Sequence, residues 1–104
     1  MILYEVNLSI SKDIFSEFNV WLKPHVEEIL GFKGFKHAHI FHDQQNDNPH
    51  FVTLIVQYEI ASIQDLDEYL EKHAPRMRAD GVNRFGNKFS ATRRILHLQQ
   101  SLKK

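Results

Sequence analysis

An α+β fold with a four-stranded antiparallel sheet is predicted by three observations on the sequence. Residues 2–10 and 51–60 each place apolar side chains at every second position, as strands with one buried face do. Each stretch is followed by a segment whose apolar residues recur at helical spacing. Residues 43–49 are polar, rich in turn-forming residues and too few for a crossover helix, so they should join two antiparallel strands.

The stretch 51–60 is the longest apolar run of the chain and is expected to be a central strand. Its wholly apolar face consists of Val52, Leu54, Val56, Tyr58 and Ile60. In the first strand, the even-numbered residues from Ile2 to Ile10 form the corresponding face. In the second strand, residues 35–42, Ala38 and Ile40 should face the helices. The opposite side of that strand would then carry Phe35, His37, His39 and Phe41.

Two helical segments follow the two alternating strands. The first should begin after Ser11, a plausible N-cap, and should kink or restart at Pro24, whose nitrogen cannot donate a hydrogen bond. The second opens with a sequence that resembles a capping box, from Ser62 to Asp65. Pro75 breaks this helix, and a further helical piece is expected from Met77 to Phe85. Residues 88–98 are expected to form the last strand.

These elements run in the order βαββαβ, which is the ferredoxin-like arrangement. Right-handed crossovers would give the strand order 4-1-3-2, with both helices on one face of the sheet. Because the chain has 104 residues and no internal linker, it is expected to form a single ferredoxin-like α+β domain over residues 1–98. Residues 99–104 are expected to be a frayed C-terminal tail.

Several short sequence motifs occur in an order and spacing typical of one protein family. They are Met-Ile-x-Tyr at the start, Val56-Gln57-Tyr58, Leu66-x-x-Tyr-Leu-x-x-His73-Ala74-Pro75, Arg84-Phe85-Gly86 and Lys88-Phe89-x-Ala91-x-Arg93. Over nearly its whole length the chain resembles the small bacterial family catalogued as domain of unknown function 4286. The resemblance implies a ferredoxin-like domain, often grouped with the dimeric α/β barrels, and no established activity. Membership of a fold does not by itself imply a function.

The charge balance argues against nucleic acid and membrane partners. Thirteen basic residues balance thirteen acidic ones, so the chain has no electrostatic footprint for a polyanion or an anionic membrane. No apolar stretch approaches the roughly 20 residues that span a bilayer, and the start of the chain lacks the features of a signal peptide. The absence of cysteine excludes disulfides and thiolate chemistry. A cytoplasmic protein is the default expectation.

Histidines cluster around the predicted hairpin, at positions 37, 39, 42 and 50. Only His37 and His39 share a strand face, and no carboxylate joins them at a reliable spacing. We therefore expect no structural metal and no cofactor. The alternative is a weak, adventitious site for nickel or zinc on these two imidazoles.

Polar side chains on the predicted strands form the candidate ligand-binding site, which consists of Asn7, His39, Gln57 and Arg93 or its neighbour Arg94. Alternation assigns the first three to the sheet face away from the helices. Polar groups in the middle of a sheet are costly unless they are paired or hydrated. They indicate an interface network, a small-molecule pocket or a catalytic site. No nucleophile–base pair, phosphate-binding loop or carboxylate pair stands out.

The sequence predicts a homodimeric module with a small-molecule pocket on the sheet face. The alternative is a cofactor-independent small-molecule enzyme of the dimeric α/β barrel type, and whether the protein is an enzyme is left open. The dimer is predicted because five large apolar side chains would lie on the face without helices, more than a monomer usually exposes. These side chains are Leu3, Phe35, Phe41, Phe51 and Ile55.

The last strand is expected to be irregular, because its apolar residues change parity along its length: Phe89 and Ala91 against Leu96 and Leu98. A β-bulge near Arg93-Arg94 would reconcile the two sets and turn Arg93 toward the face that carries Gln57. There Arg93 would pair with Glu5 or Glu59, or else would hold a small carboxylate or phosphate ligand.

Overall fold

One four-stranded sheet and three helices make up the computed structural model, which describes all residues from 1 to 104. The strands are β1 (Ile2–Ser11), β2 (Phe35–His42), β3 (Phe51–Ile60) and β4 (Phe89–His97). The helices are α1 (Phe15–Leu30), α2 (Ile63–Lys72) and α3 (Ala74–Phe85). All neighbouring strands are antiparallel, in the order β2-β3-β1-β4. This is the predicted order counted from the other edge, so the ferredoxin-like α+β fold is confirmed.

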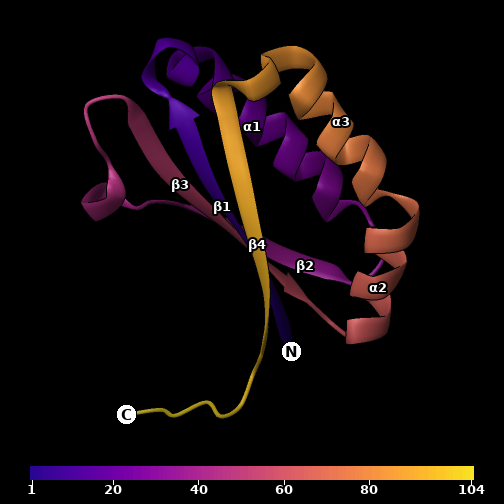
Figure 1. Cartoon of the computed structure of the whole chain (residues 1–104). Helices are drawn as coiled ribbons and strands as arrows, with labels where there is room; N and C mark the ends of the chain where they lie inside the picture. The colour runs from indigo at the N-terminus through magenta and orange to yellow at the C-terminus, as the bar shows by residue number, and fades with distance from the viewer.

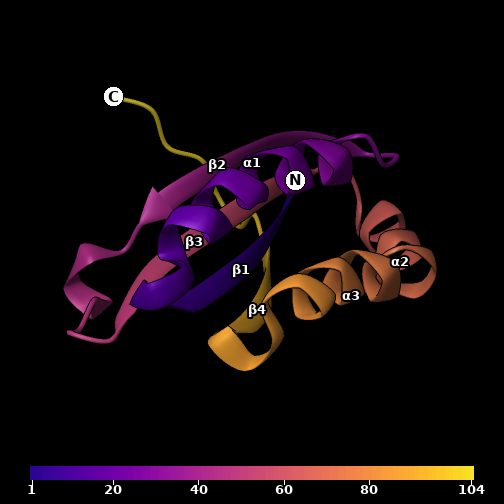
Figure 2. The same ribbon diagram turned by 90° about the horizontal axis from the view of Figure 1, so that it is seen from above.

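The helices lie on one side of the sheet, and the C-terminal tail runs away from them (Figure 1). Seen from above, α1 lies over the strands, and α3 leads away from the turn that joins it to β4 (Figure 2). The core fills the space between these layers, and Tyr4 of β1 and Val56 of β3 are both buried in it, as the alternation of the two strands predicts. No helix has the length and apolar character needed to cross a membrane. The residues after Leu98 form no helix or strand.

The helix starts differ in part from those that the sequence predicts. Ser11 does not cap α1: its hydroxyl donates to Asp13, and a 3-10 turn precedes the helix. Pro24 lies inside a continuous α1, so the helix does not restart there. Ser62 does cap α2, since its Oγ accepts a 3.2 Å hydrogen bond from the Asp65 N–H. Helix α3 begins three residues before the predicted Met77, with Pro75 in its first turn, where a missing N–H costs no intrahelical bond.

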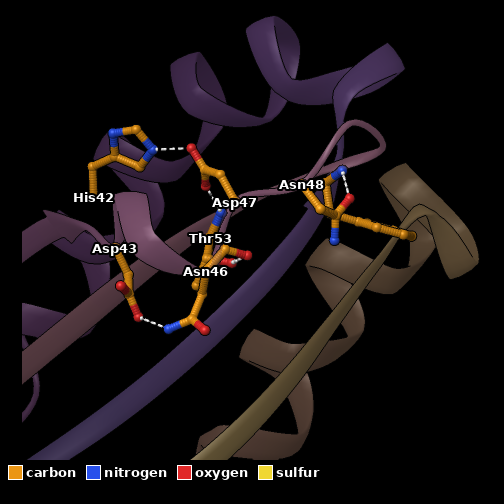
Figure 3. Close-up of polar contacts among 7 residues, drawn as sticks. His42, Asp43, Asn46, Asp47, Asn48 and Thr53 are labelled. Carbon is orange, nitrogen blue, oxygen red and sulfur yellow. Dashed lines mark hydrogen bonds and ion pairs between the residues drawn. The ribbon is translucent and has the colours of Figure 1, made fainter.

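Strands β2 and β3 form the antiparallel hairpin that the sequence predicts. Hydrogen bonds between side chains hold the segment that connects them (Figure 3). The Asp47 carboxylate accepts a 2.8 Å hydrogen bond from the Thr53 N–H and lies 2.6 Å from His42 Nε2. The Asp43 carboxylate accepts a 2.6 Å hydrogen bond from the Asn46 amide. Asp43, Asn46 and Asp47, three of the polar residues that predicted a turn here, therefore form hydrogen bonds within the hairpin.

Strand β4 is regular, so the β-bulge predicted near Arg93-Arg94 is wrong. From Phe89 to His97 every residue of β4 has one partner on β1. The parity change that suggested a bulge has a simpler cause: Leu96 lies on the sheet face without helices, where it is partly exposed. A strand with one open face tolerates an apolar residue there, so the alternation of β4 continues without a break.

The irregularity lies in β2 instead. The pairing of β2 with β3 shifts between Phe35 and His37, and an extra residue at that point reverses which face a side chain joins. Phe35 is therefore buried among the helices, with its ring 5.1 Å from Tyr69 and 5.7 Å from Tyr58. The prediction that Phe35 lies on the face without helices is wrong.

Candidate functional site

The structure does not bring the four candidate site residues together. In the sheet, His39 lies opposite Gln57, and Asn7 lies on the same face two residues further along, opposite Ile55. Arg93 lies opposite Val6 and lines the space between the sheet and the helices. Since β4 has no bulge, Arg93 keeps the parity of Phe89 and Ala91. The sheet therefore separates Arg93 from the other three residues.

A polar row crosses the sheet face without helices and is centred on Glu5, which is only 6% exposed. Arg94 Nε donates a 2.6 Å hydrogen bond to Glu5 Oε2, and Gln57 Nε2 donates a 2.8 Å hydrogen bond to Glu5 Oε1. The hydrogen bond from Arg94 lowers the pKa of the Glu5 carboxyl, and the bond from Gln57 acts in the same direction. The ion pair that the sequence predicts for Arg93 is thus made by its neighbour Arg94.

Replacing Arg94 with alanine should lower the free energy of unfolding by about 1.5–3 kcal/mol, the usual contribution of a hydrogen bond to a charged group. The buried carboxylate of Glu5 would lose its cation. Replacing Arg93 with alanine should change stability by less than about 0.5 kcal/mol, because Arg93 has no carboxylate partner. Urea denaturation of both variants measures the difference. Equal losses, or a larger loss for Arg93→Ala, would contradict this assignment.

A cavity of about 280 Å³ lies on the other side of the sheet, between the strands and helices α1 and α3. Strands β1, β3 and β4 contribute one wall, and α1 and α3 contribute the opposite wall. The buried Gly81 of α3 lies against aromatic rings, since a Cβ atom there would be 3.1 Å from Phe89 Cζ and 3.2 Å from Trp21 Cη2. A larger residue at this position would therefore project against the aromatic wall.

Aromatic rings form much of this cavity wall. Phe18 packs against Trp21 and Phe89 with ring centroids 5.3 and 5.1 Å apart. On the strand side, the Tyr4 ring lies 6.0 Å from Tyr58. Trp21 is the only tryptophan of the chain. Walls of this kind suit a flat, largely apolar molecule, because ring faces offer broad contact area with little loss of side-chain entropy.

Cationic groups meet the aromatic wall at Arg78 of α3 and Arg93 of β4. Arg78 Nη2 donates a 3.2 Å hydrogen bond to the Tyr4 hydroxyl. Burial raises the pKa of Tyr69 to about 12, and the positive charges of Arg78 and Arg93 oppose this rise. Both guanidinium groups therefore contribute positive charge near Tyr69. None of the residues that line the cavity is an aspartate or a glutamate.

His25 of α1 also lines the cavity and stacks on Trp21, with ring centroids 4.3 Å apart. Burial lowers the pKa of its imidazole, and the positive charge of Arg76 acts in the same direction. The carboxylates of Asp80 and Glu28 oppose the shift. His25 is therefore a neutral group near pH 7, able to accept a proton or a hydrogen bond beside the indole ring.

The lowered pKa of His25 should make the protein less stable in mild acid. Above about pH 6.5, the usual pKa of histidine, the imidazole is neutral in both states and has no effect. As the pH falls below that value the unfolded chain binds the proton first, so the free energy of unfolding falls until the folded state is protonated as well. Urea midpoints measured between pH 7.5 and pH 5 should fall less for His25→Gln than for the native protein. An equal fall for His25→Gln and the native protein would contradict the assignment of this pH dependence to His25.

Sequence reasoning missed most of this cavity. Only Arg93 was singled out as a candidate, and it was placed on the wrong face. Arg78 and Gly81 of α3 match no known motif, and they meet His25 of α1 only in the fold. No three or more histidine, aspartate or glutamate side chains are grouped so that they could hold a metal ion.

An antiparallel sheet of order β2-β3-β1-β4 with helices on one face defines a ferredoxin-like α+β domain, here with a cavity between its layers. The chain belongs to the family described as a domain of unknown function, DUF4286, whose sequence model matches residues 1–99. The resemblance noted in the sequence is thereby confirmed. A comparison with curated proteins found no significant sequence match.

Three solved structures with the same fold are described in different ways. A Deinococcus radiodurans protein, proposed to be an antibiotic biosynthesis monooxygenase, has 10% identity and a TM-score of 0.78, with 100% of this chain and 98% of that chain covered. SnoaB from Streptomyces nogalater, a cofactor-independent oxygenase, has 12% identity and a TM-score of 0.72, with 99% and 98% covered. A conserved protein of Methanosarcina mazei has 15% identity and a TM-score of 0.61, with 92% and 91% covered. At these identities the likeness shows the fold alone.

Proposed function

We propose that this protein is a small-molecule-binding domain whose ligand occupies the cavity between the sheet and helices α1 and α3. The observation that supports the proposal is a cavity of about 280 Å³ with mostly apolar, aromatic walls and a few convergent polar groups. An apolar cavity of about 150 Å³ can hold benzene. The larger volume here suits a flat ligand of about two fused rings.

Calorimetric titration with a neutral two-ring probe, 2-naphthalenemethanol, tests this proposal. We expect saturable binding at one site per chain. Gly81→Val should abolish it, because an added side chain at Gly81 would press on the rings of Phe89 and Trp21 and so change the shape of the cavity wall. The matched control is Ala79→Val on the same helix, at an exposed position outside the cavity. No binding to the native protein, or equal binding to a folded Gly81→Val variant, would contradict the proposal.

A second candidate function is cofactor-independent oxygenation of an aromatic substrate. It is favoured by SnoaB, which is described as a cofactor-independent oxygenase and shares the fold over nearly the whole length of both chains. The cavity contains aromatic walls and a neutral imidazole that would accept a phenolic proton. An oxygen electrode should then record uptake with electron-rich two-ring phenols, without added flavin or metal. If uptake persisted in a folded Gly81→Val variant, the cavity would not be its site.

We also propose that two copies pair through the sheet face without helices. Four apolar side chains on this face support the proposal: Leu3, Phe41, Phe51 and Ile55. Of these, Phe41 and Phe51 are 48% and 39% exposed. Asn7, His39 and Gln57 lie on the same face and would form the polar part of the interface. Two copies related by a two-fold axis would cover both patches at once.

Light scattering at micromolar concentration should give the mass of a dimer. Phe41→Glu should give a monomer, because an unpaired charge would be buried in the contact. Val20→Glu is the matched control: Val20 is exposed on α1, on the other side of the molecule, and its variant should remain dimeric. A monomer mass for the native protein would count against the pairing.

A further inference from the structure

The charge of the cavity differs from that of the whole chain. Thirteen basic and thirteen acidic residues balance overall, yet the cavity wall holds two arginines and no carboxylate. Both arginines are exposed, so this unbalanced positive charge lies at the solvent-facing edge of the apolar cavity, where it favours a ligand that carries a negative charge.

The two cavity arginines also differ from other arginines in their pairing. Arg94 is bound to Glu5 at 2.6 Å, and Arg76 is bound to Glu28 at 2.9 Å. No carboxylate lies within ion-pair distance of Arg78 or Arg93. Both side chains keep their donors available for a ligand, apart from the Arg78 bond to a tyrosine hydroxyl.

The two arginines approach the cavity from different elements. Arg78 projects from α3, and its hydrogen bond to the Tyr4 hydroxyl links it to β1. Arg93 belongs to β4 and lies opposite Val6 of the same strand β1. Tyr4 and Val6 are successive residues on the same face of β1, so the Arg78 bond to Tyr4 and the pairing of Arg93 with Val6 place both arginines beside the same part of that strand. Arginine presents its donors as a planar fork that matches the two oxygens of a carboxylate.

We propose that the cavity selects flat, roughly two-ring ligands that carry a carboxylate, with Arg78 and Arg93 holding the carboxylate and the aromatic wall holding the rings. This selectivity rests on the proposed small-molecule function and adds the chemical class of its ligand. Tyr4 acts as a positioning residue, since its hydroxyl accepts the Arg78 hydrogen bond and so fixes the guanidinium at the cavity wall.

Three probes of one shape and different charge test the proposal by calorimetry: 2-naphthoate, 2-naphthalenemethanol and 2-naphthylmethylamine. At pH 7.5 and low salt the carboxylate should bind at least about tenfold more tightly than the alcohol, the usual effect of one hydrogen bond to a charged group. The amine, a cation, should bind more weakly than the alcohol. Raising the salt concentration should weaken binding of naphthoate and leave the alcohol unchanged.

Variants then assign the effect to the two arginines. Arg78→Met and Arg93→Met should each weaken naphthoate binding by about tenfold while leaving the alcohol within about twofold. Arg84→Met is the matched control, since Arg84 also lies on α3 without a carboxylate partner but does not line the cavity. Tyr4→Phe should narrow the preference for naphthoate over the alcohol, an effect that a loss of packing alone would not produce.

The outcomes separate this inference from the function on which it rests. If none of the three probes binds, both the proposed function and the carboxylate preference are overturned. If the three probes bind equally, the cavity still binds small molecules, and only the carboxylate preference is overturned. The carboxylate preference alone is also overturned if each arginine variant, shown by circular dichroism to be folded, weakens the binding of naphthoate and of the alcohol by the same factor.

Discussion

Replacing Phe18 with alanine is expected to lower the free energy of unfolding by about 3–5 kcal/mol. Phe18 is completely buried, and its ring packs against Trp21, Phe85 and Phe89 at centroid distances of 5.1 to 5.3 Å. The substitution removes these contacts and leaves a space next to the existing cavity, so neighbouring side chains have little to collapse onto. The loss is a large part of the roughly 5–15 kcal/mol that a domain of this kind possesses.

Urea denaturation of Phe18→Ala and of a control on the same helix measures this effect. The control is Val20→Ala, because Val20 is 77% exposed, and its stability should lie within about 0.5 kcal/mol of the native value. A loss below about 1.5 kcal/mol for Phe18→Ala would mean that the ring cluster contributes little, against the typical range for a buried phenylalanine.

Replacing Gly34 with alanine is expected to cost about 2–3 kcal/mol, for two reasons that add. Gly34 has a φ of +86°, a conformation that costs a residue with a Cβ about 1–2 kcal/mol. The new Cβ would also overlap the side chain of Asp65, whose carboxylate accepts a 3.0 Å hydrogen bond from the Ser62 hydroxyl. Displacing that carboxylate costs about 1 kcal/mol more, because this hydrogen bond is lost.

Gly31→Ala in the same loop is the matched control for Gly34→Ala. Gly31 has a φ of −75°, and a Cβ there would approach only the Glu28 carbonyl oxygen, at 3.2 Å. Its stability should therefore stay within about 1 kcal/mol of the native value. Thermal unfolding of the two variants compares them, and equal melting temperatures would show that neither the conformation nor the Asp65 contact matters.

Much of the fold could be predicted from the sequence, because alternation on two strands is a strong local signal. The even-numbered residues of β1 and the apolar face of β3 are buried as predicted, except that Val6 and Val52 are only partly buried. The polar hairpin lies where turn chemistry places it. The failures are local. An extra residue in β2 moved Phe35 into the core, and no composition signal marks a one-residue shift of pairing. In β4, the parity change at Leu96 reflected an apolar side chain on the open face.

The candidate site was predicted less well, for a different physical reason. Alternation assigns a side chain to a sheet face but does not say whether the helices above that face fill the space. Asn7, His39 and Gln57 are candidates because polar side chains in the middle of a sheet are unusual. One of them, Gln57, is explained by pairing within the chain, since it donates a hydrogen bond to Glu5, which also pairs with Arg94. The cavity depends on where α1 and α3 come to lie relative to the sheet, and that distance is set by packing between segments far apart in the chain.

The occupancy of the cavity is tested most directly by the indole N–H signal of Trp21 in a two-dimensional 1H–15N NMR spectrum. The chain has a single tryptophan, which lines the cavity beside His25, so the spectrum contains one such signal. Titration with 2-naphthalenemethanol should move this signal in a saturable way, with the same midpoint as calorimetry, and Gly81→Val should abolish the shift. A Trp21 signal that stays in place while the probe binds, with shifts only at residues of the open sheet face such as Gln57, would contradict the account.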